Sequence, residues 1–355
     1  MLSRRDILQI LALAGSAAVA AELEKTSLKL SKSLRVRTIT AGIELDNASQ
    51  LDRVERAIAL LQRGRKHFED AGYEVQTARV ATNPFLAPLD SSTREKQLPM
   101  LEQLDRLAAK AGVIVSVGPL LIDDRRDESL AAWSAELVRR TKTISFSVDI
   151  ASRAVHGNAA TTAAQMMVAL STAVPGGLGN FRFAAAANIP AGTPFFPVAW
   201  HQGTESIALG LEAASVVEDA FRSVSRAELA MEALRDLMMQ ALKPVEALAT
   251  QLAEREGHRY LGIDSSPAPL KDRSIAAAIE ALTGKPFGSA STLQACSIIT
   301  AAIKSLDVRL CGYSGLMLPV LEDPWLAQRA GEGRYGIRDL LLDSSVCGTG
   351  LDVVP

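Results

Sequence analysis

The sequence predicts an α/β protein, because short β-branched stretches alternate with longer stretches whose apolar residues recur at helical spacing. The alternation begins at Arg35 and continues through most of the 355 residues. Hydrophobic residues make up 48% and charged residues 22%, as in a globular domain and unlike a disordered chain or a fibre. A fixed-period repeat is absent from the sequence, which argues against a solenoid.

The elements follow in order from hydrophobic period and from capping or turn residues. In the first half we predict strands at 36–40, 73–80, 113–117 and 143–148, with helices at 51–68, 95–110 and 127–140. In the second half we predict helices at 158–174, 205–221, 225–256, 275–282 and 292–306 and strands at 181–187 and 259–263. Pro244 is expected to bend the helix at 225–256.

The first 20 residues have the layout of a signal peptide. A basic start is followed by an uncharged apolar stretch at 7–20, which ends in small residues suited to cleavage. The order Ser3-Arg4-Arg5-Asp6-Ile7-Leu8 resembles the twin-arginine motif. We therefore expect a leader at 1–20, a polar linker at 21–34 and one α/β domain at 35–355. The location would be periplasmic or extracytoplasmic if the leader is used and cytoplasmic otherwise, with no integral membrane span after its removal.

Several functional classes are disfavoured by the sequence. The formal net charge of −2, with both signs interspersed, gives no basic surface for nucleic acid. Three widely spaced cysteines fit neither a disulfide scaffold nor a Cys-x-x-Cys zinc site. Nucleotide-binding glycine loops, the Gly-x-Ser-x-Gly elbow and His-x-x-x-His pairs are also missing from the sequence.

Polar residues that follow predicted strands are the candidate site residues, because α/β proteins bind ligands at strand ends. If a helix begins at His201, then His201, Glu205 and Glu212 share one face and can form a metal or acid/base group. Glu205 also fits a first-turn acid, and Glu212 a solvated stripe. Asp264 follows the strand at 259–263, where it can bind a cation or a hydroxyl group, or serve as a turn residue.

Glycine-rich loops near the end of the sequence are further candidates. We expect Gly312, Gly348 and Gly350 to let the backbone approach a ligand, with Cys347 as a nearby thiol. Three more carboxylates, Glu322, Asp323 and Asp352, suit Ca²⁺ or Mg²⁺, although helix capping also explains the first two.

Five segments resemble the signature segments of the domain-of-unknown-function 711 family, also called UPF0210. They are 36–42, 195–214, 260–264, 312–323 and 345–355, in the family's order. The resemblance implies a pyruvate formate-lyase-like barrel of ten strands. It does not imply a glycyl radical, because no Cys-Cys pair accompanies the loop at 309–313. Members of the family continue beyond the position of Pro355, so the barrel is expected to be incomplete at its C-terminal end.

Two functions remain open from the sequence. The first is an enzyme that acts on a small polar metabolite through a carboxylate-lined barrel interior and a divalent cation. Its predicted catalytic residues are Glu212, Asp264 and Cys347, and His201 is a predicted ligand-binding residue. The alternative is an exported, non-catalytic ligand-binding protein. The Ala/Met-rich helix at 158–174 can serve as a homo-oligomer face, or it can belong to the core.

Overall fold

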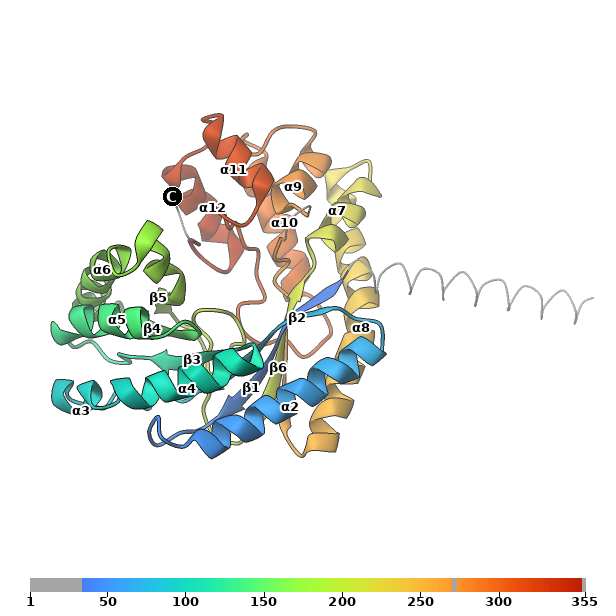
Figure 1. The fold of residues 1–355 in the computed structure, drawn as a ribbon. Coiled ribbons are helices and arrows are strands. Elements are labelled where there is room, and N and C mark those ends of the chain that lie inside the picture. The colour runs from blue at the N-terminus through green and yellow to red at the C-terminus, as the bar shows by residue number, and fades with distance from the viewer. Residues whose placement is uncertain (1–33, 270–272, 353–355) are drawn as a thin grey trace, which may run out of the picture.

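The fold is built on one curled seven-stranded sheet. The computed structural model describes residues 34–269 and 273–352. In this part of the chain the strand order is β5-β4-β3-β2-β1-β6-β7, and the sheet curls into a half-barrel with helices around it (Figure 1). The predicted α/β class is confirmed, whereas a ten-stranded barrel is not: the described sheet has seven strands. The predicted leader at 1–20 and all of the linker except Leu34 lie outside the described residues.

Two parallel blocks of strands meet in an antiparallel pair. The first block is β1 (Arg35–Ile43), β2 (Val75–Thr82), β3 (Val113–Pro119), β4 (Ile144–Ala151) and β5 (Phe183–Ala187). The second is β6 (Ser206–Glu212) and β7 (Arg259–Asp264), and β6 runs antiparallel to β1. The carboxyl ends of β1 to β5 therefore share one edge of the sheet, and those of β6 and β7 lie at the opposite edge.

Long helices cover the outer face of the sheet (Figure 1). α2 (Leu51–Asp70) packs on β1 and β2, α4 (Leu98–Ala111) on β3, α6 (Gly157–Ser171) on β4 and β5, and α8 (Ala230–Glu256) on β6 and β7. α5 (Ser129–Arg140) packs against α6, and the short α3 (Ser91–Glu95) contacts α5. α4 and α8 both end at a left-handed glycine, the usual helix stop signal, and α8 continues through Pro244.

A second group of helices gathers beside the end of the sheet at β6 and β7 (Figure 1). It contains α7 (Ala214–Arg222), α9 (Ile275–Thr283), α10 (Thr292–Lys304), α11 (Pro324–Gly331) and α12 (Ile337–Cys347). α9 packs on α7, and α10 packs on α8 and α12. Short 3₁₀ segments lie at Pro175–Arg182 and Ala227–Leu229. Across the described residues, the helices are too short or too polar to cross a bilayer.

The predicted helix at 205–221 is wrong. The chain forms strand β6 there, turns at Ala213 and only then begins α7. Every residue of β6 is buried, so its sequence lacks the alternation that marks a half-exposed strand. His201 and Glu205 consequently lie in a loop before the strand, and Glu212 lies at its far end. Six residues of strand, at about 3.3 Å each, place Ser206 and Glu212 roughly 20 Å apart.

Candidate functional site

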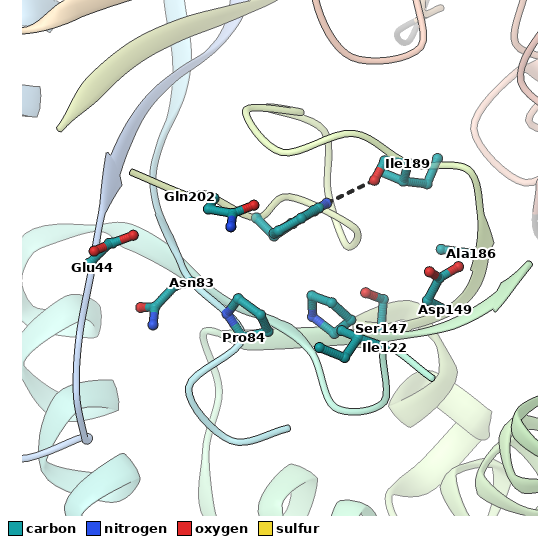
Figure 2. A pocket seen from close by; sticks show the side chains of 11 residues that line it. Glu44, Asn83, Pro84, Ile122, Ser147, Asp149, Ala186, Ile189 and Gln202 are labelled. Atoms are coloured by element: carbon teal, nitrogen blue, oxygen red, sulfur yellow. Dashed lines mark hydrogen bonds between the residues drawn. The ribbon is translucent and has the colours of Figure 1, made fainter. Parts of the chain in front are cut away.

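A pocket of about 320 Å³ lies at the carboxyl edge of the five parallel strands (Figure 2). Each of these strands contributes to it, at or directly after its last residues. The loop that joins β5 to β6 forms the opposite wall. The lining residues are Glu44, Asn83, Pro84, Pro119, Ile122, Ser147, Asp149, Ala186, Ile189, Trp200 and Gln202. A volume near 300 Å³ is within the range of small-molecule sites.

The ends of β1 and β2 supply a carboxylate and an amide on one side of the pocket (Figure 2). Glu44 Oε1 accepts a 2.7 Å hydrogen bond from the backbone N–H of Gly203, which ties the wall loop to β1. Asn83 Oδ1 accepts a 2.7 Å bond from the backbone N–H of Leu45. Both side chains are thus held in place by main-chain donors, with one polar atom of each fixed.

Strand β4 supplies a hydroxyl and a second carboxylate from the other side. Ser147 and Asp149 are two residues apart, so they share the pocket face of the strand. Ser147 is 2% exposed, and its hydroxyl has no hydrogen-bond partner among the described residues. Asp149 accepts one 3.3 Å bond from the N–H of Ala151, and burial raises the pKa of its carboxyl. The Ser147 oxygen is not one of the fully buried atoms that lack a partner, so it is open to the pocket, where a ligand or water can bond to it.

The loop at 188–205 forms a rigid wall because its polar groups are bonded. The indole N–H of Trp200 donates to the carbonyl oxygen of Ile189 at 3.0 Å (Figure 2). The N–H of Gly192 in turn donates to the carbonyl of Trp200 at 2.8 Å. Deeper in the half-barrel, Arg79 and Thr40 both donate to the carbonyl oxygen of Pro194. Burial lowers the pKa of the Arg79 guanidinium to about 9.

His201, a predicted ligand-binding residue, stabilises this loop next to the pocket through two side-chain hydrogen bonds. Its ring Nε2 bonds the carbonyl of Gly203 at 2.9 Å, and since a carbonyl only accepts, Nε2 carries the proton. Nδ1 then accepts from the hydroxyl of Ser206 at 3.2 Å. Burial lowers the pKa of this imidazole, so the neutral form is favoured. A side chain at Gly42 would collide with the ring, which shows how closely β1 approaches it.

Glu212 lies at the opposite edge of the sheet, because β6 is antiparallel to β1. Its register partner is Arg35, the first residue of β1, whose guanidinium is 3.6 Å from the Glu212 carboxylate. Gln76 Nε2 also donates to that carboxylate. Burial raises the pKa of Glu212. His201, Glu205 and Glu212 therefore do not form the trio that a helix beginning at His201 would have created.

Asp264 organises the turn of a neighbouring loop at that same opposite edge. Its carboxylate accepts hydrogen bonds from the hydroxyl of Ser266 at 2.6 Å and the N–H of Ser266 at 3.1 Å. The N–H groups of Tyr313 and Ser314 donate at 2.8 and 3.1 Å. Gly312, at φ 62°, lies so close that any side chain there would overlap the carboxylate. Despite these bonds, burial raises the pKa of Asp264.

The three predicted metal ligands have separate surroundings. Glu322 pairs with Arg37 at 2.6 Å. Asp323 caps α11 by accepting from the N–H groups of Trp325 and Leu326, and also accepts from Ser274 and Ile275 near the start of α9. Asp352 is exposed. Across residues 34–269 and 273–352, groups of three or more His, Cys, Asp or Glu side chains that could hold a metal ion are absent.

Cys347 and the two glycines after it form the end of α12. Cys347 is 1% exposed, and its sulfur accepts from the N–H groups of Thr349 and Gly350 at 3.3 and 3.2 Å. Gly348, at φ 82°, is the left-handed cap of the helix. The thiol is therefore enclosed by its own turn.

Sequence reasoning did not select the four polar residues of the strand ends: Glu44, Asn83, Ser147 and Asp149. Each lies within or directly after a correctly predicted strand region, so the rule that selected Asp264 also applies to them. Their loops lack the Gly/Pro-rich character on which the selection depended, apart from Pro84. Listing polar residues at the end of every parallel strand would have found the site.

The fold and the pocket define an α/β protein with a small-molecule-sized site at the carboxyl edge of a parallel sheet. A family model described as "Uncharacterised ACR (DUF711)" matches residues 29–355, and the chain belongs to this family. The chain is similar to a UPF0210 protein of Desulforudis audaxviator, with 27% identity over 91% of this chain and 78% of that protein. It is also similar to a UPF0210 protein of Acetivibrio thermocellus, with 27% identity over 94% of this chain and 80% of the relative.

Proposed function

We propose that this protein binds a small polar molecule in the pocket at the carboxyl edge of β1 to β5. The Ser147 side chain carries the proposal, because the residue is 2% exposed, its hydroxyl opens into the pocket and that hydroxyl has no hydrogen-bond partner among the described residues. Two carboxylates and an amide on the same rim offer further hydrogen-bond sites, and the apolar wall supplies contact area. Any reaction on the bound molecule would use Glu44 or Asp149, because Glu212, Asp264 and Cys347 do not line the pocket.

A pocket-filling substitution tests this function. Ala186 lines the pocket from β5, whereas its neighbour Ala187 is exposed and does not line it. Ala186→Phe is expected to abolish both the co-purification of a small molecule, measured by native mass spectrometry, and the thermal shift by that molecule. Ala187→Phe is the matched control and should leave both intact. Equal retention by the two variants would place the ligand elsewhere.

We make two further proposals from the sequence, an export leader and a larger barrel. We infer that residues 1–20 direct export by the twin-arginine route, on the strength of Arg4, Arg5 and the apolar stretch that follows. Changing both arginines to lysine in a reporter fusion should stop export, and continued export would contradict the inference. We also infer a lyase-like ten-stranded barrel, to which the seven strands would contribute the larger part. The proposed binding site needs only β1 to β5 and the loop that joins β5 to β6.

A further inference from the structure

The charges on the pocket lining are all negative. Among the described lining residues, the ionisable side chains are Glu44 and Asp149, and the rest are neutral or apolar. Nearby cations are directed elsewhere: Arg53 donates to the backbone carbonyl of Glu44 and Arg125 to that of Ala87. His156 bonds the backbone carbonyl of Asp149 through Nδ1 at 3.2 Å. Glu44 and Asp149 are partly buried and no described cation pairs with either carboxylate, which favours a positively charged ligand.

The two carboxylates lie at opposite ends of the pocket (Figure 2). Glu44 follows β1 and Asp149 belongs to β4, with β2 and β3 between them. Three strand spacings of about 4.8 Å separate the two backbones by roughly 14 Å. Glu44 uses Oε1 and Asp149 uses Oδ1 for the backbone bonds given above, and the second oxygen of each accepts no hydrogen bond from a described residue.

The space between the carboxylates is walled mainly by apolar groups. Pro84, Pro119 and Ile122 line it from the strand side, and Ile189 and Trp200 from the loop side. The unpartnered Ser147 hydroxyl lies toward the Asp149 end, on the same strand (Figure 2). Such a channel suits a short hydrocarbon chain, with one hydrogen-bonding group near one end.

We propose that the pocket takes a linear diamine, with one ammonium group on Glu44 and the other on Asp149. The proposal rests on the pocket being the ligand site, as proposed above. Each ammonium group would donate to the carboxylate oxygen that has no protein donor, at the roughly 2.8 Å usual for charge-assisted bonds. If the two carboxylate oxygens are about as far apart as the two backbones, the two contacts leave about 8 Å between the ammonium nitrogens, which favours chains near five carbons. A single Ca²⁺ or Mg²⁺ ion fits poorly, because it needs several oxygen ligands within about 2.6 Å of one point.

Calorimetry on the full chain tests the charge and the length of the ligand together. Unbranched diamines of three to eight carbons are titrated, with pentylamine, 1,5-pentanediol and glutarate as controls of matched length. We expect the five-carbon diamine to bind best, pentylamine to bind at least tenfold more weakly, and the diol and the diacid not to bind. Equal binding of the diol, binding of the diacid, or binding of no diamine would overturn the proposal.

Variants test the two carboxylates. Glu44→Gln and Asp149→Asn are each expected to weaken diamine binding at least tenfold, to the level of pentylamine. Asp123→Asn changes an exposed acid beside the pocket and should leave diamine binding unchanged. If Glu44→Gln fails to fold because Glu44 holds Gly203, Asp149→Asn decides alone. Undiminished diamine binding by Asp149→Asn refutes the proposal. If Ala186→Phe loses a neutral co-purifying ligand, the pocket is still supported as the ligand site while the diamine is not. The proposed site and the proposed ligand can therefore be refuted independently.

Discussion

The sequence predicts a catalytic role for Asp264, whereas its hydrogen bonds in the structure indicate that it stabilises a turn. The variant Asp264→Asn tests which of the two roles is right. The variant keeps the size of the side chain but replaces one acceptor oxygen by an NH₂ group. Four donors point at this carboxylate, from Ser266 (two), Tyr313 and Ser314. An amide oxygen can accept at most two of them, so at least two of the four N–H or O–H donors lose their partner.

The size of the effect follows from these bonds. A hydrogen bond to a charged group contributes about 1.5–3 kcal/mol, and an unsatisfied buried donor costs about 1–3 kcal/mol. We therefore expect Asp264→Asn to lower the free energy of unfolding by about 3–5 kcal/mol. Most domains have about 5–15 kcal/mol in total, so the variant should still fold at low temperature.

Urea unfolding followed by circular dichroism measures this loss, with Asp149→Asn as the matched control. Asp149 accepts one long backbone bond, so its substitution should change the unfolding free energy by less than about 1 kcal/mol. Ligand binding should show the reverse order, lost in Asp149→Asn and kept in folded Asp264→Asn. If Asp264→Asn is fully stable but loses ligand binding, the structural assignment is wrong and the functional role predicted from the sequence is right.

Two further predictions concern acids of the C-terminal helices. Asp323→Ala removes the cap of α11 and the contact with α9, and should lower the unfolding free energy by about 2–4 kcal/mol. EDTA should not shift the melting temperature of the wild type. A shift would indicate a metal role for this residue. Burial and the neighbouring Asp339 raise the pKa of the Asp343 carboxyl to about 6, from 3.8 in the unfolded chain. The folded state therefore binds the proton more tightly, and the free energy of unfolding falls as the pH rises from 3.8 through 6. Asp343→Asn should therefore stabilise the protein at pH 8, by no more than about 3 kcal/mol, and the gain should vanish in melts below the unfolded pKa; a gain independent of pH would refute this reasoning.

The local pattern of the chain was sufficient to predict most elements. Glycine stops such as Gly112 and Gly257 end helices where the sequence indicated, and β-branched stretches such as 113–117 form strands. Two elements differ from the prediction: α12, which was not predicted, and β6, which was predicted as a helix. The β6 stretch Ser206–Glu212 is buried throughout, and a continuous apolar stretch carries no period that separates a strand from a helix.

The sequence by itself determined the α/β class, the order of most elements and the family resemblance, because hydrophobic period, caps and turns are local properties. Only the tertiary structure decided which strand ends meet. The antiparallel pairing of β1 with β6 sends Glu212 and Asp264 to one edge of the sheet and leaves Glu44 and Asp149 at the other. Strand direction in a sheet depends on contacts between residues more than 100 positions apart, such as Ile39 with Leu209, and no local pattern encodes it.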